Sequence, residues 1–185
     1  MGGFTIVELL IVIVVIGILA AITTVSFSLV RIKSENTKTL AAAQAWYKAF
    51  KMYEADHGEM PHVGFDSCLG DPYVWDYEGT SSGTNQCRYV NFSYYTVKPA
   101  IATALRPYIG PGVQPTPSMQ VIGTSTNWSR GITYVTPAVG GTLQLLVTLA
   151  GVSTCPTLAG QATLNASTSY GNGITCSYGL GTRLR

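Results

Sequence analysis

Negative charge is missing from most of this sequence. Only 11% of its 185 residues are charged, and no Asp or Glu follows Glu78. The chain has two histidines, His57 and His62, and both precede that acid. The sequence GTSSG at 79–83 fits the G-x-S-x-G pattern of a hydrolase elbow, but that serine needs an acid and a histidine later in the chain. No phosphate loop, H-E-x-x-H or G-x-G-x-x-G sequence occurs either, so we predict no enzyme activity and no cofactor.

Ligands for a metal ion are also sparse. The acids at 66, 71, 76 and 78 lie in a turn-rich segment, 62–86, but lack the regular spacing of a calcium loop. The four cysteines include no Cys-x-x-Cys pair, which argues against zinc. We therefore predict no metal site and interpret these acids as solvated loop side chains.

The cysteines fall into two close pairs, Cys68 with Cys87 and Cys155 with Cys176. Four cysteines allow three disulfide connectivities, and this one encloses the shortest loops, of about 20 residues each. In an exported domain the thiols oxidise, and each bridge adds on the order of 3 kcal/mol of stability. We predict both disulfides, the second of which bounds a C-terminal region at 155–176.

Charge and proline are both absent from a long N-terminal stretch. No charged residue lies between Glu8 and Arg31, and the first proline is Pro61. The 22 residues 9–30 would form a helix of roughly 33 Å, enough to cross a hydrocarbon core of about 30 Å. Because backbone polar groups in lipid have to pair within their own segment, we expect a membrane-spanning helix over 4–30.

The apolar pattern changes after Val30 but does not stop. Apolar and aromatic residues recur at steps of three and four from Leu40 to Phe50, which is typical of an amphipathic helix. Nothing breaks the helix before His57-Gly58. We predict one continuous helix over 4–56, whose half at 31–56 packs on the rest of the chain.

The remainder of the chain, 57–185, has room for one compact domain. Its strand-like runs are rich in Tyr, Val, Ile and Thr and lie at 88–97, 120–123, 132–136, 142–149 and 174–178. A long helix followed by such strands predicts an α+β fold, in which an antiparallel sheet covers the second half of the helix.

Glu8 is the unusual residue at the head of the apolar stretch. An unpaired carboxylate there is costly unless a cation neutralises it. A secretory signal peptide would be cut after its apolar core, whereas the small residues Gly2 and Gly3 precede the core here. Cleavage between Gly3 and Phe4 would keep the span on the mature chain and create an α-amine four residues from Glu8.

This N-terminus, with Gly3, Phe4, Glu8 and the sequence GILAAI at 17–22, resembles the methylation motif of type IV pilins and type II secretion pseudopilins. The resemblance implies the pilin fold, a leader at 1–3, cleavage after Gly3 by a prepilin peptidase, and methylation of the Phe4 amine. It also implies that Glu8 pairs with the terminal amine of a neighbouring copy as a filament grows from the membrane.

Two small residues extend this set of expected assembly residues. Gly17 and Ala21 lie four apart on one helical face, and small residues at that spacing let helices approach closely. The expected partners are other copies of the chain in a helical polymer, the prepilin peptidase, the pilus assembly machinery, and membrane lipid before assembly. The expected location is the cytoplasmic (inner) membrane for the monomer and the extracellular space for the filament.

The resemblance leaves two functions open. One is a structural subunit of a type IV pilus, acting in adhesion, motility or DNA uptake, and the other is the major pseudopilin of a type II secretion system. Such pseudopilins often bind calcium through C-terminal carboxylates, and the absence of acids after Glu78 therefore favours the pilus subunit.

The C-terminal half carries further features for recognition. Its cations, which include Arg88, Arg106 and Arg130, are interpreted as solubilising charges. The alternative is a basic face for DNA, an acidic polymer, a neighbouring subunit or a host-surface ligand. Sequons begin at Asn91, Asn127 and Asn165, so these three residues are candidates for glycosylation.

Overall fold

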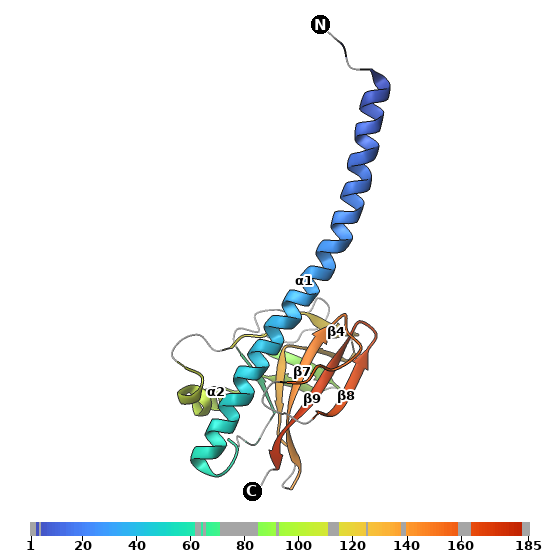
Figure 1. Ribbon diagram of the computed structural model, residues 1–185. Coiled ribbons are helices and arrows are strands. Elements are labelled where there is room, and N and C mark those ends of the chain that lie inside the picture. The colour runs from blue at the N-terminus through green and yellow to red at the C-terminus, as the bar shows by residue number, and fades with distance from the viewer. Residues whose placement is uncertain are drawn as a thin grey trace. The chain divides into compact units, whose positions relative to one another are not determined.

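The computed structural model describes residues 3, 5–61, 64, 66–70, 85–91, 93–110, 115–124, 126–137, 140–158 and 164–182, without the side chains of 23–26, 164–166 and 182 (Figure 1). The chain divides into two compact units, Met1–Ser34 and Glu35–Arg185. All of the described strands belong to the second unit, and the architecture is α+β with antiparallel sheets.

Helix α1 runs over Ile6–His57 and contributes to both units. It ends where Gly58 takes a φ of 75° and donates its N–H to the carbonyl oxygen of Glu54 at 2.8 Å. Glycine adopts this left-handed conformation without a Cβ clash, and the hydrogen bond closes the last helical turn. The prediction of one long N-terminal helix is confirmed, and the helix ends one residue later than expected.

Within the described residues, the strands form two sheets. The five-stranded sheet has the order β1-β6-β7-β9-β8, with β1 at Ser67–Leu69, β6 at Ile132–Val135, β7 at Thr142–Ala150, β8 at Leu164–Tyr170 and β9 at Gly173–Thr182. The four-stranded sheet has the order β3-β2-β5-β4, with β2 at Gln86–Val90, β3 at Ser93–Thr96, β4 at Val121–Gly123 and β5 at Trp128–Arg130. Helix α2, Pro99–Leu105, and the 3-10 turn η1, Arg106–Tyr108, follow β3.

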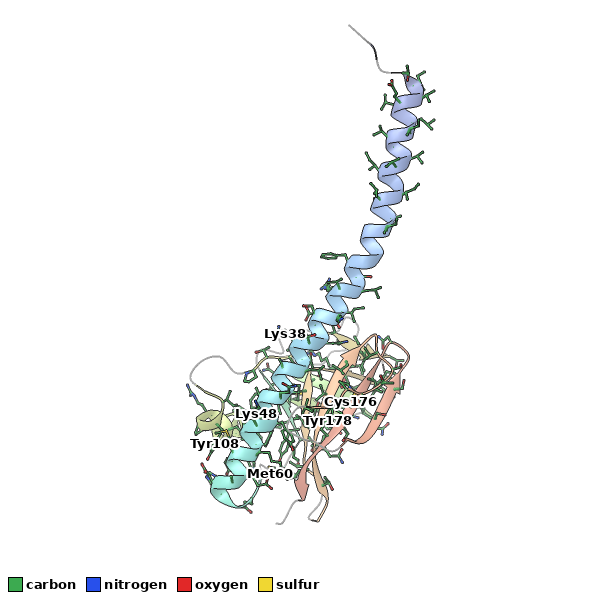
Figure 2. All side chains as sticks on the ribbon, viewed as in Figure 1. Lys38, Lys48, Met60, Tyr108, Cys176 and Tyr178 are labelled. Carbon is green, nitrogen blue, oxygen red and sulfur yellow. A yellow bond between two sulfur atoms is a disulfide. The ribbon has the colours of Figure 1, made fainter. Side chains whose placement is uncertain are left out.

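The core of the second unit lies between the later half of α1 and the five-stranded sheet. That half of α1 runs beside β7 and β9 in Figure 1, and its Trp46 and Phe50 are fully buried. Phe50 stacks on Tyr134 of β6 with ring centroids 4.6 Å apart. Cys176 and Tyr178 of β9 belong to the same buried cluster (Figure 2). The amphipathic pattern therefore identifies the helix face that the sheet covers.

The four-stranded sheet packs on the other face of the five-stranded sheet. Ser129 of β5 and Thr148 of β7 share a hydrogen bond between their hydroxyls, 2.7 Å long and buried. Nearby, the Cys87 sulfur of β2 lies 3.2 Å from the Thr133 hydroxyl of β6. Since side chains alternate between the two faces of a strand, Thr133 and Thr148 face the four-stranded sheet, whereas their neighbours Tyr134 and Val147 belong to the core beneath α1.

The strand prediction was incomplete. The run 88–97 is a hairpin, because Asn91 turns the chain between β2 and β3 with a φ of 50°, a conformation that Asn tolerates. Strands β1, β5 and β8 and helix α2 were not predicted. β1 and β5 have three residues each, too short for an alternating pattern to stand out, and β8 is rich in Ser, Thr and Asn.

Candidate assembly site on the N-terminal helix

The first unit consists of a helical span with its apolar side chains exposed. The described large apolar side chains from Ile6 to Val30 have exposed fractions between 48% at Val15 and 85% at Ile6. Among the described residues, α1 is the one helix long and apolar enough to cross a membrane. Apolar surface of this extent is unfavourable in water, so the span is stable only in lipid or against other protein.

Thr5 and Glu8 cap the start of this span by reciprocal hydrogen bonds. The backbone N–H and the hydroxyl of Thr5 both donate to Glu8 Oε2, each at 2.8 Å. In return, the backbone N–H of Glu8 donates to the Thr5 hydroxyl oxygen at 3.3 Å. This is a capping box, which satisfies helix N–H groups that have no partner within the helix.

Sequence reasoning missed the role of Thr5. The spacing of a Thr three residues before a Glu, at the head of an apolar run, is the signature of such a cap and would have indicated it. The cap also gives Glu8 a structural role within one chain, in addition to the intermolecular role that the resemblance implies.

The cap leaves half of the Glu8 carboxylate available. Both Thr5 donors reach Oε2, and among the described residues Oε1 accepts no hydrogen bond. A carboxylate can accept at both oxygens, so a cation can pair with Oε1 while Thr5 keeps its contacts with Oε2. Helix capping and charge pairing are therefore compatible at this residue.

The other predicted assembly residues lie along the same segment. Gly3 is exposed and precedes the helix, whereas Phe4 lies outside the described residues. Gly17 and Ala21 are exposed on α1, and a Cβ built on Gly17 would meet no atom within 4 Å. The exposed backbone at Gly17 is where a second helix could approach most closely.

Both predicted disulfides are present. Cys68–Cys87 joins β1 of the five-stranded sheet to β2 of the four-stranded sheet. Cys155–Cys176 joins the segment after β7 to the middle of β9. The first bond ties the two sheets together, and the second holds the chain that follows β7 against the core.

The three arginines considered for a basic face do not share one environment. Arg130 is only 2% exposed, and its Nε donates to the carbonyl oxygen of Gln86 at 2.7 Å. Arg88 is half-buried, whereas Arg106 is exposed in η1. Arg130 is therefore a structural cation rather than a solubilising surface charge, which weakens the alternative of a basic face for DNA.

The sequons differ in accessibility. Asn91 is exposed in the β2–β3 turn, not within a strand as predicted. Asn127 is half-buried, accepts a hydrogen bond from the Asn91 N–H at 3.2 Å, and precedes the buried Trp128 and Ser129. The side chain of Asn165 lies outside the described residues. Of Asn91 and Asn127, the two sequon asparagines whose side chains are described, Asn91 is the exposed one.

The acids of the turn-rich segment include one structural residue. Asp66 Oδ1 accepts hydrogen bonds from the Thr136 N–H at 2.7 Å and from its hydroxyl at 3.2 Å. This acid therefore holds the end of β6, and its interpretation as a solvated loop side chain was wrong. The acids at 71, 76 and 78 lie outside the described residues.

The first unit thus presents an exposed apolar span with a capped acid at its head, and the second unit is a disulfide-bridged domain of two sheets. No protein-family model, curated protein or solved structure matches this chain. Function is therefore inferred from the chemistry of these residues and from the α+β architecture.

Proposed function

We propose that this chain is a pilin, the structural subunit of a type IV pilus. The observation that carries the proposal is the exposed apolar span of α1 with the capped acid Glu8 at its head. A disulfide-bridged α+β domain, with an antiparallel sheet on the second half of the same helix, is the kind of outer domain that such a subunit needs.

The span has two successive environments in this proposal. Lipid covers it in the monomer, and the spans of neighbouring subunits cover it in the filament. Burial stabilises apolar surface by about 25 cal/mol per Å² relative to water, so contact between spans supplies the cohesion of the polymer. Gly17 and Ala21 allow those helices to approach closely.

Glu8 sets the register between subunits. Cleavage after Gly3 exposes the α-amine of Phe4, and this amine pairs with Glu8 Oε1 of an adjacent copy. The contact forms away from water, where an uncompensated charge is costly and a paired one is specific. Only one axial offset between two helices brings the amine of one subunit to the acid of the next.

Substitution at Glu8 and at Thr5 separates charge pairing from helix capping. Glu8→Gln keeps a hydrogen-bond acceptor for the cap, since glutamine also serves in capping boxes, but removes the charge. Thr5→Ala removes the capping hydroxyl and keeps the charge. In cells that contain a prepilin peptidase, we expect Glu8→Gln to reach the membrane and to reduce filament yield at least tenfold. Thr5→Ala should form filaments at a yield close to that of the wild type.

Filament yield is measured by electron microscopy and immunoblotting of sheared surface material, and cleavage by mass spectrometry of the N-terminus. The wild-type filament should begin with methylated Phe4. A mature filament that retains Met1–Gly3, or a Glu8→Gln filament yield equal to that of the wild type, would overturn the proposal. Thermal unfolding of the chain with and without a calcium chelator distinguishes the pseudopilin alternative, which predicts destabilisation by the chelator.

A further inference from the structure

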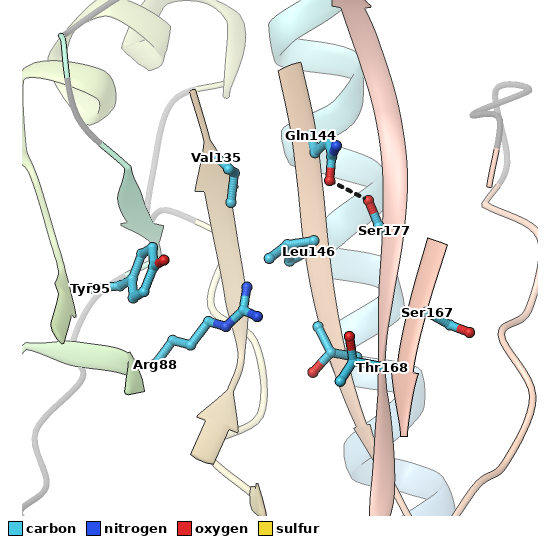
Figure 3. Close-up of a pocket in the computed structure, with 9 residues that line it drawn as sticks. Arg88, Tyr95, Val135, Gln144, Leu146, Ser167, Thr168 and Ser177 are labelled. Carbon is cyan, nitrogen blue, oxygen red and sulfur yellow. Dashed lines mark hydrogen bonds between the residues drawn. The ribbon is translucent and has the colours of Figure 1, made fainter. Parts of the chain in front are cut away.

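A pocket of about 200 Å³ lies on the five-stranded sheet, on the face opposite α1 (Figure 3). Gln144 and Leu146 of β7 with Thr175 and Ser177 of β9 form its floor, and Arg88 of β2 and Tyr95 of β3 form one wall. The lining residues are Arg88, Tyr95, Val135, Gln144, Leu146, Ser167, Thr168, Thr175 and Ser177. A cavity of about 150 Å³ accommodates benzene, so this pocket has room for a single six-membered ring.

Strand alternation explains why β9 contributes hydroxyl groups to the floor. On β9, Thr175 and Ser177 alternate with the core residues Cys176 and Tyr178. The floor hydroxyls face a cavity although both residues are only 3% exposed. A sheet face that served only as core would carry apolar side chains at these positions.

Two polar atoms of the pocket have no partner within the described part of the chain. Arg88 Nε and Thr175 Oγ1 are both buried and make no hydrogen bond. Buried polar groups are normally satisfied, and those that are not need an explanation. Of the five such atoms in the described part of the chain, these two meet at one small cavity, where a charged donor and a hydroxyl are suited to a polar ligand.

A neighbouring threonine on the same face, Thr148, has a hydroxyl that forms a hydrogen bond. Thr148 of β7 lies directly across from Thr175 of β9 in the sheet register. Thr148 is 5% exposed, and its hydroxyl pairs with that of Ser129 at 2.7 Å. Thr175 is similarly buried, at 3% exposed, but its hydroxyl has no such pair among the described residues, and Thr175 rather than Thr148 lines the pocket.

The wall supplies a positive charge and an aromatic ring. The Arg88 guanidinium lies 5.5 Å from the centre of the Tyr95 ring, and Figure 3 shows it extending towards Leu146 and Thr168. Arg88 has no carboxylate partner among the described residues. Opposite, Ser177 donates to Gln144 Oε1 at 2.7 Å, and the Gln144 amide N–H groups donate to no described residue, so they can orient towards a ligand.

We propose that this pocket binds an acidic monosaccharide unit, a sugar ring that carries a carboxylate. Arg88 pairs with the carboxylate, Thr175 and Gln144 bond the ring hydroxyls, and the Tyr95 ring covers an apolar face of the sugar. The lining residues indicate this class of ligand. The one cation matches one negative charge, the hydroxyls and the amide match the hydroxyl groups of a sugar, and the volume fits one ring. The site lies in the second unit and does not depend on filament formation.

Ligand-detected NMR on the full chain in detergent tests the proposal, with D-glucuronate, D-glucose and inorganic phosphate as probes. Glucuronate should bind at least tenfold more tightly than either of the other two. Arg88→Gln should weaken glucuronate binding roughly tenfold or more, since a hydrogen bond between charged groups is lost. An unchanged melting temperature of Arg88→Gln shows that the fold is intact.

Two matched threonine variants supply an independent readout. Thr175→Val should weaken glucuronate binding about threefold to tenfold and raise the melting temperature of the ligand-free protein, because an unsatisfied buried hydroxyl is removed. Thr148→Val should leave binding unchanged and lower the melting temperature, because the Ser129 hydroxyl loses its partner.

Four results would overturn the proposal. They are equal affinity for glucuronate and glucose, phosphate binding as tight as glucuronate binding, an Arg88→Gln variant with wild-type affinity, and no glucuronate binding by a folded wild-type chain. A Thr175→Val variant with a lowered melting temperature and wild-type affinity would likewise contradict the role given to that hydroxyl.

Discussion

At the scale of single residues, the second unit is stabilised by buried polar side chains that form hydrogen bonds with residues distant in sequence. Tyr178 is fully buried, and its hydroxyl donates to the carbonyl oxygen of Pro156 at 2.5 Å. Pro156 follows Cys155, which is bonded to Cys176, so Tyr178 and the disulfide hold the same segment. Arg130 and Trp46 act in a similar way, each donating to a backbone carbonyl of a distant segment.

The burial of Tyr178 makes stability depend on alkaline pH. Burial raises the pKa of the Tyr178 hydroxyl from 10.0 to about 12, because the phenolate would be desolvated. The folded state therefore holds this proton more tightly than the unfolded state does. The protonated Tyr178 hydroxyl contributes fully to the free energy of unfolding below pH 10. As pH rises from 10 towards 12, roughly 2–3 kcal/mol of this free energy is lost.

Replacement of this hydroxyl should change the alkaline behaviour. Tyr178→Phe loses a hydrogen bond worth about 1 kcal/mol near neutral pH, but its free energy of unfolding should fall less than that of the wild type above pH 10. Denaturant unfolding at pH 8 and at pH 11 measures both effects. Tyr170→Phe, at a half-buried residue of β8 whose hydroxyl makes no hydrogen bond among the described residues, is the control and should follow the wild type. Parallel losses in Tyr178→Phe and the wild type would contradict the assignment.

At the scale of secondary-structure elements, helix α1 is attached to the sheet by side-chain hydrogen bonds as well as by apolar packing. Asn36 donates through Nδ2 to the Ala150 carbonyl at 2.8 Å and accepts through Oδ1 from the Ala150 N–H at 3.1 Å. Ala150 is the last residue of β7. The Asn36 amide therefore pairs with the end of β7 much as a neighbouring strand would.

Loss of this amide should weaken the contact between helix and strand. Asn36→Ala leaves both backbone groups of Ala150 without their present partner, and we expect it to lower the free energy of unfolding by about 1–3 kcal/mol. Lys48→Ala, on an exposed position of the same helix, should change it by less than about 0.5 kcal/mol. Thermal and denaturant unfolding of both variants make the comparison, and equal stabilities would refute the role of Asn36.

At the scale of the whole molecule, two disulfides stabilise a second unit whose two sheets are assembled from strands distant in sequence. Cys68 and Cys87 are both buried, at 2% and 0% exposed, and their bond joins the two sheets. Cys155 is half-buried, so its bond to Cys176 includes a residue that is more exposed than either Cys68 or Cys87. Reduction by a thiol requires access of the attacking thiolate to a sulfur.

The two bonds should differ in their response to a reductant. Under native conditions, dithiothreitol should reduce Cys155–Cys176 about tenfold faster or more than Cys68–Cys87, because access differs. Differential alkylation followed by mass spectrometry identifies which thiols appear first. After addition of denaturant the rates should become similar. Simultaneous reduction of both bonds in the folded protein would contradict this ranking.

The sequence by itself determined the elements that depend on local pattern. An uncharged run without proline, continued by an amphipathic repeat, predicts one helix, because helical hydrogen bonds form between residues close in the chain. The pairing of Cys68 with Cys87 and of Cys155 with Cys176 was also predictable, since the nearest cysteines close the shortest loops. The Thr5–Glu8 cap is local too, and its spacing could have been recognised.

The tertiary structure alone decided what depends on distant residues. Strands β1, β5 and β8 exist because their partners provide hydrogen bonds, and short or polar strands carry little signal of their own. Arg130 is buried, and Arg88 and Thr175 line the same pocket, because of the way the two sheets pack. The spacing of residues along the chain does not predict this packing. Pairing between strands is non-local, so a linear pattern identifies candidate strands, whereas only the folded chain establishes their neighbours.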